Sequence, residues 1–205
     1  MVHLSENPKI TCRCNACELT LSDPTPKMSV LCACEDCRQA LSWAAKFGGK
    51  KPSGLVHNVY LRCDFSEIVG REHMQATQLR DDARSTRIFC RHCYACIGID
   101  HVRYMNRVFM VQPDHCSLNF ELSVKPTAVL FLSDYRGSDA PVPTDDTPIF
   151  HSFEDPQDYA RYRAIPVVAE TFSGPLGPPT GHTMSDLIES LKPVDNLGLT
   201  RGAPP

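Results

Sequence analysis

The sequence lacks the features that mark membrane proteins and nucleic-acid-binding proteins. No stretch approaches the roughly 18 consecutive apolar residues of a membrane span, and Met1 to Ile10 has no apolar core of the signal-peptide type. The net charge is −3, with Lys and Arg dispersed and no run of five or more like charges. We therefore expect no nucleic-acid or membrane partner, and we expect a cytoplasmic protein.

Long helical patterns are also scarce. Seventeen prolines and eleven glycines favour short strands and turns. Apolar segments, several with a period of two, predict strands at 29–31, 55–61, 87–89, 108–111, 119–124 and 129–132. Helical spacing is confined to 35–46 and to 184–191, where Thr183 and Asp186 can form a capping box. We expect a mainly β domain over residues 1–170, with one or two short helices, followed by a Pro/Gly-rich tail over 171–205.

Cysteine, in contrast, is abundant. The chain has eleven, an odd number, and a reducing compartment opposes disulfides, so these thiols are expected to be metal ligands or core residues. Seven of them form three clusters on closely spaced positions, where thiols on tight turns can converge on one ion: Cys12 and Cys14, then Cys32, Cys34 and Cys37, then Cys90 and Cys93.

Seven thiols divide naturally into four and three. Structural Zn²⁺ sites take four tetrahedral ligands, whereas catalytic sites keep three protein ligands and an exchangeable position. Pairing Cys12 and Cys14 with Cys90 and Cys93 predicts a closed structural site. Cys32, Cys34 and Cys37 would then hold a second, catalytic Zn²⁺ whose fourth position is open to water, a substrate thiolate or a carbonyl oxygen.

Two other interpretations of the cysteines stay open at this point. In one, Cys12 and Cys14 join two members of the middle cluster, which leaves Cys90, Cys93, Cys96 and His92 for the other ion. In the other, the first pair fills a buried strand and the last pair is a redox couple. The remaining cysteines are expected to act as apolar core residues: Cys17, Cys63, Cys96 and Cys116.

Three further residues are candidates for catalysis beside the second ion. Three thiolates give that site a negative charge, and Arg38 is the first candidate for a compensating cation, although it can equally be a solvated helix residue. Asp36 can move protons or cap the helix. His57 lies in an alternating strand, where it is either a general acid or base or a structural residue.

At these residues the sequence resembles the glutathione-dependent formaldehyde-activating enzyme family, which also includes relatives such as centromere protein V. The family pattern runs CxCG, then CxCxxCR followed by a helix, then FCxxCG. Here it appears as Cys12-Arg13-Cys14-Asn15, as Cys32 to Cys37 with Arg38, and as Phe89-Cys90-Arg91-His92-Cys93-Tyr94. The resemblance covers about Ile10 to Pro113 and resumes weakly at 147–153.

The resemblance implies a fold of small antiparallel sheets stapled by zinc, similar to the Mss4-like group. It also implies two Zn²⁺ ions with the same four-plus-three division of ligands, and a carbon–sulfur lyase or synthase activity that joins glutathione to formaldehyde. Asn15 and Tyr94 replace family glycines, and residues 133–147 and the tail exceed the family pattern. These departures put the substrate in doubt more than the metal sites.

The expected function is therefore a zinc-dependent carbon–sulfur lyase or synthase. Its substrate would be an adduct of glutathione or another small-molecule thiol with a carbonyl compound or similar intermediate, in a specialised pathway. A noncatalytic zinc module and a zinc hydrolase or dehydratase are the alternatives. Whether the chain forms a homo-oligomer is left open.

Overall fold

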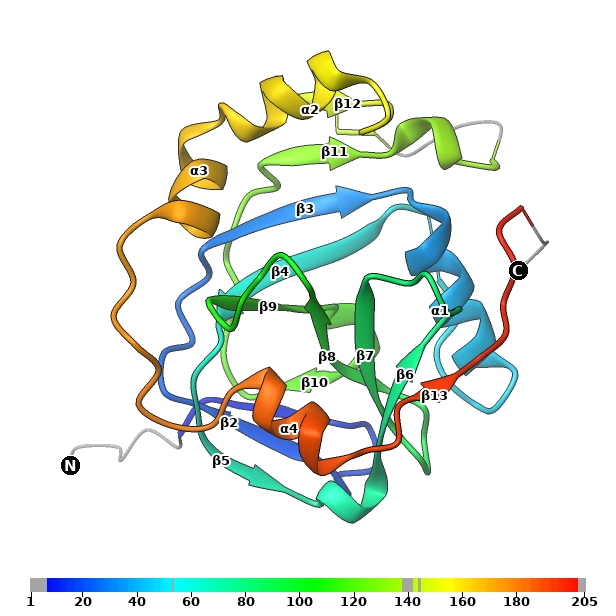
Figure 1. The fold of residues 1–205 in the computed structure, drawn as a ribbon, viewed down its shortest axis with the longest axis vertical. Coiled ribbons are helices and arrows are strands. Elements are labelled where there is room, and N and C mark those ends of the chain that lie inside the picture. Colours follow the sequence, from blue (N-terminus) through cyan, green and yellow to red (C-terminus); the bar gives the residue numbers. More distant parts are fainter. Residues whose placement is uncertain (1–6, 53, 138–141, 144, 203–205) are drawn as a thin grey trace.

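A computed structural model describes residues 7–52, 54–137, 142–143 and 145–202. Within this part of the chain the fold consists of two β-sheets and four short α-helices (Figure 1). The expectation of a mainly β fold is confirmed. Four helices occur in place of the one or two predicted, and the larger sheet is neither small nor wholly antiparallel.

The larger sheet has nine strands, in the order β12-β11-β3-β4-β9-β8-β7-β6-β13. Its central strands pair antiparallel, but β11 runs parallel to both β3 and β12, and β13 runs parallel to β6. The strands span β3 Met28–Cys32, β4 Val56–Arg62, β6 Met74–Gln78, β7 Ser85–Cys90, β8 Cys96–His101, β9 Val108–Val111, β11 Ala128–Leu130, β12 Ile149–Phe150 and β13 Asp195–Asn196.

The smaller sheet has four strands in the order β10-β1-β2-β5, all antiparallel. They span β1 Lys9–Thr11, β2 Glu18–Leu21, β5 Phe65–Val69 and β10 Ser117–Leu118. The strand predicted at 119–124 is wrong, because the ladder ends at Leu118 and residues 121–127 are irregular.

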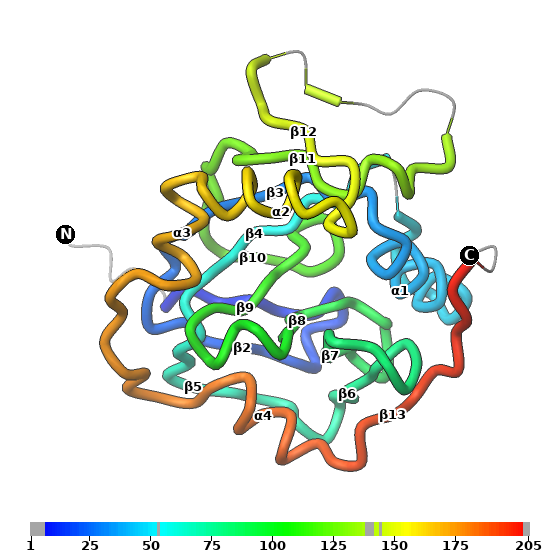
Figure 2. Tube along the Cα trace, turned by 45° about the horizontal axis from the view of Figure 1, so that its top comes forward, coloured from blue at the N-terminus to red at the C-terminus, as the bar shows by residue number. Residues whose placement is uncertain are grey.

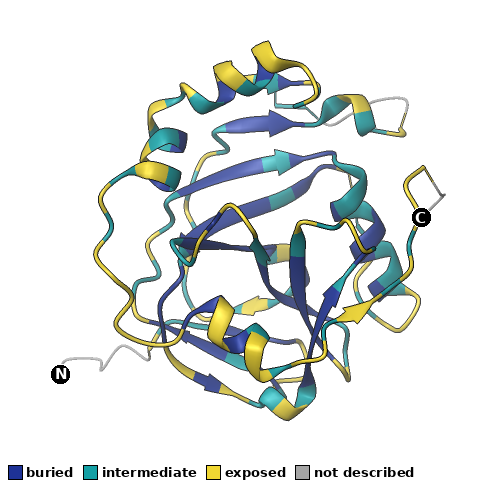
Figure 3. Ribbon diagram, viewed as in Figure 1, coloured by how far each residue is buried: buried dark blue, intermediate teal, exposed yellow. Residues whose placement is uncertain are grey.

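The nine-stranded sheet separates two apolar cores (Figure 3). On one face, Val59, Ile88 and Phe109 pack against the four-stranded sheet and helix α4, Met184–Ser190. On the other face, Tyr60 and Phe89 pack against the helices α1 Glu35–Ala45, α2 Pro156–Arg163 and α3 Pro166–Ser173. Because side chains alternate along a strand, each strand supplies both cores.

Helices α2 and α3 were not predicted from the sequence. Each begins with a proline, Pro156 and Pro166, at the first helical positions. At that position the missing N–H would have no intrahelical partner in any residue, and the fixed φ of proline suits a helix. Two of the prolines that favour turns in the sequence therefore begin helices instead.

The C-terminal segment packs on its own chain. His182 forms a β-bridge with Phe65, and Met184 and Leu187 are fully buried in the core shared by both sheets. After β13 the chain passes along α1, where the Gln39 side chain donates to the Thr200 carbonyl at 2.8 Å (Figure 2). The predicted capping box of Thr183 and Asp186 is present at α4.

Two further expectations concern membranes and the long connection near residue 140. Among the described residues, no helix combines the length and apolar character needed to cross a membrane. The connection over 133–147, which exceeds the family pattern, lies partly outside the described residues, at 138–141 and 144.

Candidate metal centres

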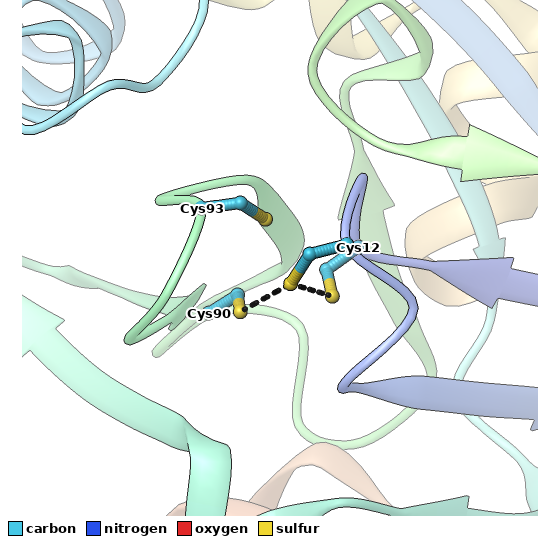
Figure 4. A group of neighbouring side chains, drawn as sticks. Cys12, Cys90 and Cys93 are labelled. Atoms are coloured by element: carbon cyan, nitrogen blue, oxygen red, sulfur yellow. Dashed lines mark hydrogen bonds between the residues drawn. The ribbon is translucent and has the colours of Figure 1, made fainter.

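The first cysteine group joins two turns that are far apart in the sequence. Cys12 and Cys14 lie in the turn between β1 and β2, and Cys90 and Cys93 lie at the end of β7 and in the turn before β8. The four sulfurs all lie within 4.8 Å of one another. Figure 4 shows the side chains of Cys12, Cys90 and Cys93 pointing toward one another from these two turns.

The spacing of these sulfurs fits a tetrahedral zinc site. With Zn–S bonds of about 2.3 Å, the sulfurs of a tetrahedron lie about 3.8 Å apart. The Cys14 sulfur lies 3.4 Å from that of Cys12 and 3.6 Å from that of Cys90. A disulfide would need about 2.05 Å, and all eleven cysteines are free.

Backbone geometry holds both turns of this group in place. Asn15 and Tyr94, which replace family glycines, have φ values of 59° and 52° in the left-handed region. Asn adopts that region more readily than most residues. The Tyr94 ring meets Trp43 of α1 at 5.6 Å and stacks at 5.0 Å on Phe47, just after the helix, and these ring contacts offset the backbone strain.

The second cysteine group lies where β3 passes into α1. The sulfurs of Cys32, Cys34 and Cys37 lie within 4.8 Å of one another, with Cys32 and Cys37 buried and Cys34 half-buried. Cys34 is the N-cap of α1, and its sulfur accepts the Cys37 N–H at 3.3 Å. The Cys34 N–H donates to the Cys32 sulfur at 3.4 Å. These bonds and the positive end of the helix favour thiolate sulfur.

Only one of these three thiols ionises readily without a metal. Hydrogen bonds from the Cys32 and Cys34 thiols, with help from the Arg87 charge and the Asn58 amide, hold the pKa of Cys37 well below its usual range. Its two neighbours hold the pKa of Cys32 far above that range. Three thiolates this close repel one another, so a divalent cation is what would allow all three to ionise.

The observed grouping decides between the partitions left open by the sequence. Cys12 and Cys14 lie with Cys90 and Cys93, not with the middle cluster, so the alternative partition is wrong. Cys96 takes no part in either group: it is 1% exposed in the core, where burial raises the pKa of its thiol to about 12. Cys17 and Cys63 are likewise buried, and Cys116 is half-buried.

The polar candidates near the second group have other partners. The Arg38 guanidinium donates to the carbonyl oxygen of Asp134. The Asp36 carboxylate forms an ion pair with Arg80 at 2.7 Å, and Cys34, not Asp36, caps the helix. These contacts fix the first turn of α1 against its surroundings and leave neither side chain bonded to the sulfurs.

His57 lies on β4 opposite Leu31 of β3, one residue from Cys32. Strand alternation places Val56 and Asn58 on the sheet face of the cysteine group and His57 on the other face. Val56 packs against Cys32 and Cys37, and Asn58 bonds Cys37. The His57 ring is half-buried, and burial, partly opposed by Asp114, lowers its pKa. The structure therefore does not bring His57 together with the three sulfurs.

Sequence reasoning missed the polar groups that do face the second group. The Gln112 side chain donates to the Asn58 oxygen at 3.0 Å, and the Asn58 amide donates to the Val56 carbonyl at 3.4 Å. Asn58 also contributes to the lowered pKa of Cys37. Both amides are almost fully buried, as is Arg87. Asn58 and Arg87 are polar residues inside strands with apolar neighbours, and Gln112 directly follows such a strand. This is the signal in the sequence, because a buried polar group needs a partner.

No known family model and no curated protein matches this chain. The resemblance to the formaldehyde-activating family therefore rests on the cysteine motifs and their spacing.

Proposed function

We propose that the chain is a zinc enzyme with one structural and one catalytic ion, acting as a carbon–sulfur lyase or synthase on a thiol adduct of a carbonyl compound. The observation that carries the proposal is the contrast between the two groups. One offers four sulfurs, and the other offers three, with no fourth Cys, His, Asp or Glu donor among the described residues. Four sulfurs complete a tetrahedron, whereas three leave a position for an external ligand.

The environment of the three-cysteine group favours a thiol as that ligand. Cys34 is its most accessible member, so an external ligand reaches the group from the side of Cys34. Phe131 and Leu41 pack against the group and give it an apolar wall, which suits a soft sulfur ligand better than a charged oxygen. When bound, zinc supplies Lewis acidity and lowers the pKa of a ligated thiol or water.

The reaction is the reversible opening of a hemithioacetal. The hydroxyl proton passes to solvent water, the C=O bond forms, the C–S bond breaks, and its electron pair returns to sulfur as a thiolate. In this chain, Cys32, Cys34 and Cys37 would hold the ion, and the Cys37 N–H bond to the Cys34 sulfur fixes the first turn of α1 around it. Glutathione and formaldehyde are one substrate pair of this class, and the resemblance to the formaldehyde-activating family supports them.

The test is NMR exchange spectroscopy on hemithioacetals of glutathione and of smaller thiols, with purified zinc-loaded protein. We expect faster exchange that requires the thiol and that disappears in Cys34→Ser, while Cys17→Ala exchanges as the wild type does. Binding of two ions without acceleration of any adduct would indicate a noncatalytic module. Turnover of a substrate without any thiol would indicate a hydrolase or dehydratase.

A further inference from the structure

Arg87 is a buried cation that lacks the usual partners of a buried cation. It lies on β7 and is 3% exposed. Its Nε and Nη1 groups are buried and have no hydrogen-bond partner among the described residues. No ion pair among these residues includes Arg87. An unpaired guanidinium in an apolar interior is costly, so its position requires a negative charge nearby.

The register of the sheet places Arg87 near the start of β7, on the face that α1 covers. Arg87 and Phe89 share one face of β7, and the Phe89 ring lies 5.3 Å from Trp43 of α1. Arg87 pairs with Thr77 near the end of β6, and Arg80, just beyond that end, pairs with Asp36 in the first turn of α1. The Arg80–Asp36 ion pair therefore ties the end of the β6–β7 hairpin, where β7 begins, to the start of the helix.

The charged and titratable groups around Arg87 leave the three thiolates as its natural counter-charge. The Arg87 charge lowers the pKa of three nearby groups, Cys37, Cys96 and His101. Burial keeps Cys96 a neutral thiol and lowers the pKa of His101, so neither supplies a negative charge. Three thiolates with one divalent ion carry a net charge of −1, and a fourth thiolate from a substrate would make it −2.

We infer that Arg87 is the positioning cation of the three-cysteine site, whose buried charge favours an anionic sulfur ligand over a neutral one at the open position. This inference rests on the proposed function, because it assumes that the group holds a metal ion. Arg87 would act through the thiolates and would not touch the reacting carbon. Arg38, which is next to Cys37 in the sequence, has its guanidinium on the carbonyl of Asp134 and provides a matched comparison.

The experiment compares anionic and neutral ligands on cobalt-substituted full-length protein. Thiocyanate, 2-mercaptoethanol and imidazole are titrated against the visible and thiolate-to-cobalt charge-transfer bands. Thiocyanate and the thiolate of 2-mercaptoethanol are anionic, whereas imidazole is neutral. We expect Arg87→Met to lower the ratio of anion affinity to imidazole affinity on the order of tenfold or more. Arg87→Lys, which keeps the charge, and Arg38→Met should preserve the wild-type ratio.

An unchanged ratio in Arg87→Met, or an equal loss in Arg38→Met, would overturn the inference. If Arg87→Met does not fold, the affinities of the cobalt-substituted wild-type protein decide. Tighter binding of imidazole than of thiocyanate would contradict a compensating cation, and tighter binding of thiocyanate would support it. Failure of the proposed function is distinguishable. The proposed function fails if the three-cysteine group binds no cobalt, or if the bound cobalt takes up thiocyanate but no thiol.

Discussion

Replacement of Cys34 by serine and by alanine separates its two roles, as metal ligand and as helix cap. Its sulfur belongs to the three-cysteine group and also accepts the Cys37 N–H at 3.3 Å at the start of α1. Serine is a good N-cap but a poor zinc ligand, and alanine is neither. Both variants should therefore lose one of two ions, and only alanine should also lose the cap.

The size of the second effect follows from the cap. Loss of an N-cap side chain costs about 1 kcal/mol, which in a chain of this length corresponds to a melting temperature lower by roughly 2–4 °C. We expect Cys34→Ala to melt lower than Cys34→Ser by that amount, with equal zinc content in the two variants. Elemental analysis gives the zinc per chain, and circular dichroism gives the melting temperature.

Cys17→Ala is the matched control, because Cys17 is fully buried beside the four-cysteine group but is not one of its members. This variant should keep both ions. The reasoning is refuted if Cys34→Ser retains two ions. It is also refuted if either Cys34 variant loses both ions and unfolds, since the two groups would then not be independent.

Three further predictions concern the four-cysteine group, the C-terminal segment and the pH dependence of stability. Cys90→Ala should abolish the folded state, because Cys90 is fully buried and its group joins two distant turns; a native circular dichroism spectrum with one bound ion would contradict this. Asp64→Asn should destabilise the protein by about 2 kcal/mol and expose residues 177–182 to limited proteolysis. The reason is that the buried Asp64 carboxylate accepts hydrogen bonds from the N–H groups of Thr180 and Gly181 at 3.0 and 2.9 Å. An unchanged digestion pattern would contradict this role of Asp64. His57 has a lowered pKa, mainly because of burial, so the unfolded chain binds its proton more readily and stability falls as the pH drops below about 6.5. His57→Gln should lose less stability than the wild type between about pH 7 and 5. Urea unfolding at several pH values gives the free energy of unfolding, and the same pH dependence in both proteins would show that His57 does not contribute.

The parts of the fold that the sequence predicted are those set by local spacing. The CxC and CxxC motifs lie on tight turns, so the sulfurs within each motif lie close together. Only the joining of Cys12 and Cys14 with Cys90 and Cys93 depends on the rest of the fold. Helix α1 follows from the spacing of Ala40, Leu41 and Ala44, all buried in the structure. The α4 capping box is likewise a pattern within four residues.

The parts that it did not predict depend on partners far away in the chain. The parallel pairing of β11 with β3 joins residues about a hundred positions apart, and no local pattern encodes it. Arg38 was chosen as the compensating cation because it is next to Cys37 in the sequence, whereas the cation whose charge acts on Cys37 comes from β7. Arg87 can be recognised only when the sheet register is known.

The most direct test of the central claim is zinc-edge X-ray absorption of the purified protein before and after addition of a thiol. Seven sulfurs shared by two ions average 3.5 sulfur ligands per ion, with the remainder from oxygen or nitrogen. The proposal predicts a rise to about four sulfurs per ion when the thiol binds, because zinc completes a tetrahedron. A sulfur count that stays near 3.5 per ion with saturating thiol would contradict an open position at Cys32, Cys34 and Cys37.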